Sequence, residues 1–113
     1  MVKGYVPAKG DIVWLDFNPQ SEHEQKGHRP AIVVSGEEYN RKTGLALMCP
    51  VTSRVKGYVF EVSINHDGIN GVVLSDQVKS LDWKVRNASF IAKADDKELE
   101  AVLRNISVIL LGD

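Results

Sequence analysis

The chain has 113 residues, of which 43% are hydrophobic and 26% are charged. This length allows one domain with a single modest core, and the composition is that of a globular protein rather than a disordered one. The formal net charge of −1 does not mark the chain as a nucleic-acid binder.

Charge is distributed less evenly than this sum suggests. Between Arg41 and Lys93 there are eight basic residues and four acidic ones. Acidic residues gather instead near Glu22, Glu37 and Asp95. The pattern is compatible with a locally basic face, and a mixed surface would give similar counts.

Cys49 is the only cysteine, which rules out an internal disulfide and is typical of an intracellular protein. It lies in the apolar segment Leu47–Pro50, so we expect it to belong to the core. The histidines lack the spacing of a metal site, and no phosphate-binding glycine loop occurs, so no metal or cofactor is expected. No apolar run approaches the roughly 20 residues of a membrane span, and no signal-peptide core is present. We therefore expect a cytoplasmic protein.

Alternating apolar residues predict a series of short strands. The first covers Asp11–Phe17, with Ile12 and Trp14 on one face and Val13 and Leu15 on the other. Further strands are expected, in chain order, at Ala31–Ser35, Leu45–Val51, Tyr58–Ile64, Val72–Leu74, Val78–Leu81 and Phe90–Ala92.

Turn and cap residues complete this outline. Glu37–Gly44 is expected to form one or two helical turns, and Asn65–Gly68 and Asn70–Gly71 are turn signals. The last segment is a helix in which Asp95 is the N-cap and Glu98 completes a capping box. Its apolar stripe consists of Leu99, Val102, Leu103, Ile106 and Leu110. Short antiparallel strands with one closing helix predict an α+β or mostly-β small barrel.

The segment Gly27–Ser35 joins a flexible cationic stretch to a buried strand. Arg29 stands at the junction, where its guanidinium at the rim of the sheet can bind a phosphate with two hydrogen bonds. Pairing with a carboxylate such as Glu22 or Glu24 is an equally good interpretation. The polar loop of residues 18–28 precedes this strand, and loops between rigid strands often carry function.

Other polar residues lie in this loop or near predicted strand ends, namely Glu24, His28, Thr52, Gln77 and Lys79. Such a set suits metal-free cleavage of RNA, in which the attacking group is the RNA's own 2′-hydroxyl. Arginine and threonine can stabilise charge and align the attack, whereas a histidine or a carboxylate is better suited to proton transfer. A structural role, with Thr52 closing a strand and Glu24 as a solvated charge, explains the same residues.

Several linked motifs stand at Gly10–Pro19, Glu24–Ala31, Pro50–Thr52, Lys56–Tyr58 and Asp76–Ser80. Together they resemble the MazF/PemK family of toxin endoribonucleases, over almost the whole chain. The resemblance implies a single toxin domain over residues 1–113, with a small antiparallel Src-homology-type barrel (CcdB/PemK-like) and a C-terminal helix. It also implies a homodimer and cleavage of single-stranded mRNA to 2′,3′-cyclic phosphate and 5′-hydroxyl ends. The implied partner is a MazE-type antitoxin whose acidic tail occupies the RNA groove.

The same resemblance assigns roles to particular residues. By position, Arg29 and Thr52 match the catalytic pair of the family, and Glu24 and His28 match residues implicated beside that pair. The positions that match the RNA groove are Phe17, Lys56, Gln77 and Lys79.

Two further basic residues, Lys84 and Arg86, are expected around the groove because of their charge. Residues 19–23 and 85–93 match the family least well, which leaves the recognised RNA sequence open. One rival class is the CcdB-type gyrase poisons, which share the fold but cut nothing and use a C-terminal Trp-Gly-Ile. This chain has Leu111-Gly112-Asp113 there. The other rival is a non-catalytic barrel that binds RNA or peptide.

Overall fold

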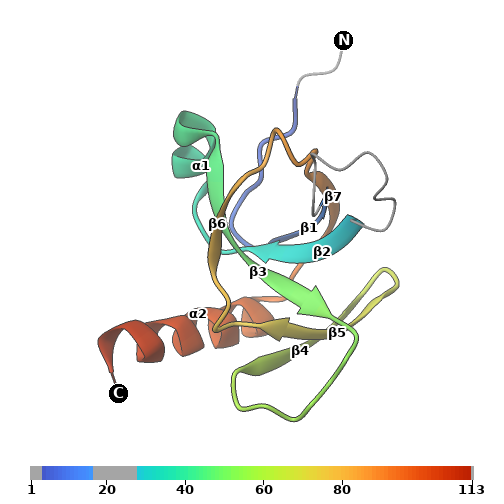
Figure 1. Ribbon diagram of the computed structural model, residues 1–113, viewed down its shortest axis with the longest axis vertical. Helices are drawn as coiled ribbons and strands as arrows, with labels where there is room; N and C mark the ends of the chain where they lie inside the picture. Colours follow the sequence, from blue (N-terminus) through green and yellow to red (C-terminus); the bar gives the residue numbers. More distant parts are fainter. Residues whose placement is uncertain (1–3, 17–27, 113) are drawn as a thin grey trace.

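The computed structural model describes residues 4–16 and 28–112 and shows a curled antiparallel sheet crossed by one long helix (Figure 1). Within these residues the elements in chain order are β1 (Asp11–Asp16), β2 (His28–Val33), α1 (Glu37–Thr43), β3 (Leu45–Thr52), β4 (Glu61–His66), β5 (Ile69–Leu74), β6 (Lys79–Asp82), β7 (Ser89–Lys93) and α2 (Asp96–Leu111).

The long strand β3 organises the sheet. The strand order is β4-β5-β3-β2-β1-β7, and β6 pairs with β3 outside this path. One edge of β3 pairs with β2, while the other pairs first with β6 at Leu45–Met48 and then with β5 at Val51 and Thr52. The path ends at β4 and β7, so the sheet is a curled half-barrel. The predicted class, a mostly-β antiparallel barrel with a C-terminal helix, is confirmed.

The two faces of the sheet carry two hydrophobic clusters, as the alternation in β1 predicts. Ile12 belongs to a cluster that includes Val102 of α2, with Trp14 packed against it. Val13 and Leu15 point the other way and join a second cluster. Because both faces of β1 are covered, its backbone is held firmly between them.

Helix α2 begins as the sequence predicts, with Asp95 as N-cap and a complete capping box to Glu98. The prediction of its apolar stripe is right for four of the five residues: Val102 is buried, and Leu99, Leu103 and Ile106 pack against the first cluster. It is wrong for Leu110, which is 75% exposed. The C-terminal end of α2 runs beyond the sheet (Figure 1), and Leu110 lines a hollow there with Leu103 and Ile106.

Strand β2 begins at His28, three residues earlier than Ala31. His28 and Arg29 pair with Asp16 and Leu15 of β1, so the strand extends into the predicted loop. Pro30 lies inside this strand, one residue before the register with β3 begins at Ala31. Arg29 therefore belongs to the sheet itself. Residues 18–27 of the predicted loop lie outside the described residues.

Strand β4 begins at Glu61 rather than at Tyr58. The carboxylate of Glu61 accepts the backbone N–H groups of Lys56 and Gly57, at 3.1 and 3.0 Å. These bonds hold residues 56–60 as a loop beside the strand. The hairpin between β4 and β5 turns at Asp67 and Gly68, whose φ angles of 43° and 85° suit a tight two-residue turn.

The predicted turn at Asn70–Gly71 is wrong, because both residues lie inside β5. Gly71 has a different reason to be glycine. A Cβ atom placed there would lie 2.1 Å from the carbonyl oxygen of Thr52, a distance that real Cβ atoms do not reach. Glycine at this position lets β5 approach the end of β3 closely.

Candidate active site

One groove among the described residues, of about 430 Å³, is here named the central groove. It contains four of the predicted site residues, Arg29, Thr52, Gln77 and Lys79. Its apolar wall includes Leu15, Ala31, Met48, Pro50 and Leu81. Residues 50 positions apart in the sequence thus line one depression.

Strand pairing explains why Arg29 and Thr52 come together. The register of β2 with β3 places Ala31 opposite Pro50. The pairing ends there, and two residues beyond it along each strand stand Arg29 and Thr52, both of which line the central groove. Arg29 is exposed and Thr52 half-buried, as befits residues at the rim of a groove. Both also line a smaller cavity of about 250 Å³ together with Gly68, Ile69 and Asn70, here named the turn hollow.

The hydroxyl of Thr52 is oriented by the chain that follows it. Its oxygen accepts the backbone N–H of Arg54 at 3.1 Å. This bond leaves the hydroxyl proton available to donate toward the groove. Thr52 lines the central groove, the turn hollow and a third cavity, so it stands where the three meet.

The third cavity, here named the loop groove, has a volume of about 510 Å³ and is lined by Arg54, Lys56 and Tyr58. The predicted residue Lys56 lies here, and Gln77 is shared with the central groove. The Tyr58 hydroxyl donates to Asp76 at 2.9 Å, and this hydrogen bond raises the pKa of Tyr58. The exposed ring is thereby fixed beside two cations, an arrangement that can stack an unpaired base.

Basic side chains outnumber free acidic ones around these grooves. Arg86 lines the central groove, as expected from its charge, and also donates to the carbonyl oxygen of Asp16 at 3.2 Å. Lys84 does not line the grooves described above; its ammonium lies 5.6 Å from the centre of the Trp83 ring. Basic side chains are therefore concentrated around the grooves, although the net charge of the whole chain is close to zero.

The predicted proton-transfer residues are placed differently. The His28 ring stacks on Trp14, with centroids 4.5 Å apart, and its Nδ1 lies 3.8 Å from Asp16 Oδ1. His28 is not among the residues that line the three cavities. Glu24 and the groove residue Phe17 lie outside the described residues.

Cys49 is fully buried, and burial raises the pKa of its thiol to about 12. The prediction that it is a core residue is confirmed. Sequence reasoning missed Tyr58 and the hairpin turn at Gly68–Asn70 as walls of the site. The local signals for Tyr58 were its place next to the basic connector and its inclusion in the Lys56–Tyr58 motif, and the turn residues carried no signal of this role.

No helix in the described parts of the chain is both long enough and apolar enough to cross a membrane.

Comparison with known proteins gives a consistent result. The family model of PemK-like, MazF-like toxins of type II toxin–antitoxin systems matches residues 8–110. The endoribonuclease toxin MazF of Escherichia coli K12 is 44% identical over 110 residues, which cover 97% of this chain and 99% of that protein. The endoribonuclease toxin ChpB of the same strain is 34% identical over 116 residues, with the same coverage.

A crystal structure of MazE-MazF from Deinococcus radiodurans superimposes with a TM-score of 0.84 at 46% identity. The alignment covers 96% of this chain and 98% of the other. Fold, sequence and length therefore agree over nearly the whole chain, and the chain belongs to the PemK-like, MazF-like toxins of type II toxin–antitoxin systems.

Proposed function

We propose that this toxin is a metal-independent endoribonuclease that cuts single-stranded mRNA, with Arg29 and Thr52 as its catalytic pair. Family membership supports the activity, because relatives that span its whole length are named endoribonucleases. The observation that carries the residue assignment is the register of β2 and β3, which brings Arg29 and Thr52 into one groove with Gln77 and Lys79.

The reaction needs no nucleophile from the protein. The 2′-hydroxyl of a nucleotide attacks the adjacent phosphorus, the bond to the 5′-oxygen of the next nucleotide breaks, and a 2′,3′-cyclic phosphate and a 5′-hydroxyl result. Arg29 would bind two oxygens of the pentacoordinate phosphate, and the hydroxyl of Thr52 would donate a further hydrogen bond. His28 and Glu24 stay candidates for proton transfer.

The flanking nucleotides would lie along the remaining groove residues. Lys79 and Gln77 line the central groove and Lys56 the loop groove, so a single strand that passes Thr52 would meet cations on both sides. Phe17 is proposed as a further contact. These residues hold the phosphate backbone and the base edges, while the reacting phosphate sits between Arg29 and Thr52.

The function is tested with purified protein, a long single-stranded RNA and an excess of EDTA. Discrete fragments are expected, because the proposed charge stabilisation comes from side chains. Their 5′ ends should accept a phosphate from a polynucleotide kinase without prior dephosphorylation, which distinguishes a 5′-hydroxyl from a 5′-phosphate. Binding without any fragments would contradict the proposal and favour a non-catalytic RNA-binding barrel. If the protein neither binds nor cuts the RNA, the result would favour the gyrase-poison class.

We also propose an antitoxin of MazE type, since a close structural relative was crystallised as MazE-MazF. Its acidic tail would occupy the same grooves as RNA. Replacing Lys56 and Lys79 by Glu should then weaken both ligands together. For RNA, two lost phosphate contacts should reduce the salt slope of binding by about 1.4, at roughly 0.7 per single-strand contact. The measurement uses 2′-O-methyl RNA, which cannot be cut, and a peptide of the tail alone.

The matched control reverses two exposed lysines that do not line the three cavities, Lys9 and Lys42. It should change neither affinity by more than a small factor. If the Lys56/Lys79 variant loses RNA affinity but holds the tail as tightly as wild type, the shared surface is refuted.

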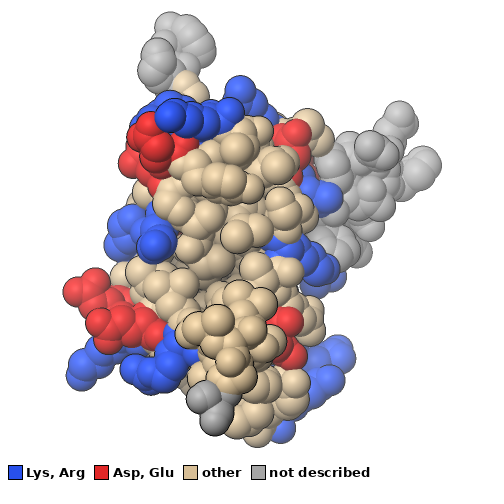
Figure 2. All heavy atoms as spheres, turned by 90° about the vertical axis from the view of Figure 1, so that its left-hand side faces the viewer, with Lys and Arg blue, Asp and Glu red and all other residues tan. Residues whose placement is uncertain are grey.

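A homodimer in the cytoplasm, built from one domain over residues 1–113, completes the proposal. Exposed apolar side chains on the C-terminal part of α2 support the homodimer, because a second copy of the chain could cover them. Val108, Ile109, Leu110 and Leu111 are 43 to 82% exposed there. Figure 2 shows a strip of uncharged residues at this end of the molecule, with charged residues on both sides of it. An apolar surface of this kind is typical of an interface between subunits.

A further inference from the structure

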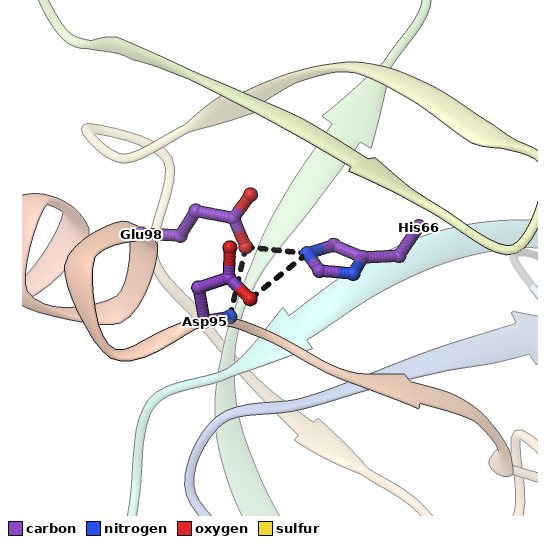
Figure 3. Close-up of side chains that lie close together, drawn as sticks. All are labelled: His66, Asp95 and Glu98. Atoms are coloured by element: carbon purple, nitrogen blue, oxygen red, sulfur yellow. Dashed lines mark hydrogen bonds and ion pairs between the residues drawn. The ribbon is translucent and has the colours of Figure 1, made fainter.

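A second group of titratable side chains lies where the hairpin of β4 and β5 meets the start of α2 (Figure 3). His66 Nε2 is 2.6 Å from Glu98 Oε1 and 3.9 Å from Asp95 Oδ1. The side chains of His66 and Glu98 are only 18% and 16% exposed. The pair His66–Glu98, here named the clasp, therefore joins two elements in a partly buried place.

The local chemistry favours a protonated histidine over a bound cation. Both carboxylates already serve the helix: Glu98 Oε1 accepts the backbone N–H of Asp95 at 2.9 Å, and the Asp95 side chain caps the N3 backbone group. The N-terminus of a helix carries partial positive charge, which stabilises carboxylates and opposes an added metal ion. A charged imidazole can complete this arrangement by donating one hydrogen bond to Glu98.

The clasp lies at one end of a rigid path to the candidate active site. His66 pairs with Ile69 across the tight turn. Gly68, Ile69 and Asn70 form a wall of the turn hollow, whose other wall contains Arg29 and Thr52. Gly71 follows Asn70 directly and lies so close to the backbone of Thr52 that no Cβ fits between them. A shift of the hairpin must therefore move the wall of the hollow or Thr52 itself.

We propose that the clasp is a proton-dependent positioning device: protonated His66, bound to Glu98, fixes the β4–β5 hairpin against α2 and thereby holds Thr52 and the wall of the turn hollow in place for RNA cleavage. His66 and Glu98 are positioning residues, because they act through the hairpin. The proposal rests on the assignment of Arg29 and Thr52 made above.

The sign of the pH dependence follows from the groups around the ring. The hydrogen bond to Glu98 raises the pKa of His66 above its ordinary value of about 6.5. Partial burial lowers this pKa, whereas the negative charges of Glu98, Asp95 and Asp67 raise it further. The folded state thus binds this proton more tightly than the unfolded state. The clasp contributes its full stabilisation of the folded state below a pH of about 6.5. This contribution is lost as the pH rises through the elevated pKa of His66.

The first test follows ¹H–¹⁵N and histidine ring resonances of the free protein between pH 5 and pH 9. His66 should titrate above its ordinary range, and the amides of Thr52 and Asn70 should move with the same midpoint. Glu98→Gln keeps the capping-box acceptor but removes the charge, so it should lower that midpoint. The matched control Asp96→Asn removes a charge from the same helical turn without touching His66. If Thr52 and Asn70 do not follow His66, or if Asp96→Asn acts as strongly as Glu98→Gln, the proposal is overturned.

The second test compares cleavage by three proteins. His66→Gln never carries the charge, and His66→Lys carries it throughout. We expect kcat/KM of wild type to match His66→Lys at low pH and to approach His66→Gln at high pH. The two variants should differ by about threefold to tenfold, which is less than the cost of a misplacement near 1 Å, on the order of 100-fold. Rates taken as ratios at each pH cancel the intrinsic pH dependence of the chemistry.

Parallel pH profiles for wild type and His66→Gln would refute the positioning role. Failure of the underlying assignment looks different, because an Arg29 variant would then cleave normally while the resonances of Thr52 still followed His66.

Discussion

Replacing Arg29 by alanine is expected to reduce RNA cleavage by on the order of 10³-fold or more, which is the range reported for arginines that stabilise charge on a transferring phosphate. Arg29 is exposed at the groove rim, and the core residues of β2 are Ala31, Ile32 and Val33. The melting temperature should therefore change little. Single-turnover cleavage of a short RNA measures the loss, and thermal unfolding measures the stability.

Two variants sharpen this result. Arg29→Lys keeps the charge but loses the planar fork, so it should recover only a small part of the rate. Arg41→Ala removes another exposed arginine, which pairs with Glu37 and Glu38 on α1 and does not line the three cavities, and should cleave normally. Cleavage by Arg29→Ala within tenfold of wild type would show that another group stabilises the reacting phosphate.

Local sequence patterns predicted those parts of the fold that depend on local physics. The alternation of Ile12, Val13, Trp14 and Leu15 gave the two faces of β1, and the Asp95 and Glu98 spacing gave the start of α2. Each depends on a period or a cap that one segment specifies by itself.

The errors arose where distant segments decide the outcome. Asn70–Gly71 has the composition of a hairpin turn, but Asp67 and Gly68 already provide the turn, and Gly71 instead meets the backbone of Thr52. The sequence pattern predicts a loop position for His28 and the junction of that loop with the strand for Arg29, yet β1 offers both residues partners in Asp16 and Leu15. Neither outcome can be derived without knowing which strands pair.

The candidate site shows the same division. Arginine and threonine at strand ends fit phosphate chemistry, but on the residues alone a structural role was the favoured interpretation of Thr52. The register of β2 with β3 adds the missing information, since it brings Thr52 beside Arg29 at a common rim. The clasp was missed entirely, because His66 and Glu98 are 32 residues apart and the capping box that contains Glu98 does not indicate a histidine partner.

Thr52→Val is expected to lower the cleavage rate by on the order of 10²- to 10³-fold, which is typical for the loss of one hydrogen-bond donor to a transition state. Valine keeps the branched shape at the end of β3, so packing beside Val51 and Val72 should survive. The variant also loses the bond from the Arg54 N–H, and because that bond is exposed we expect only a small fall in melting temperature. The decisive measurement is single-turnover cleavage set beside thermal unfolding.

Thr43 offers a matched control for that structural bond. Its hydroxyl oxygen likewise accepts a backbone N–H, from Leu45 at 3.0 Å, and it lies outside the three cavities. The hydroxyl of Thr43 also donates to the Tyr39 carbonyl oxygen at 2.8 Å, so Thr43→Val should lose at least as much stability as Thr52→Val and keep full activity. Thr52→Ser should retain most of the rate because the donor remains. If the activity of Thr52→Val falls only as far as its stability does, and no further than in Thr43→Val, then the hydroxyl of Thr52 closes a strand and takes no part in the reaction.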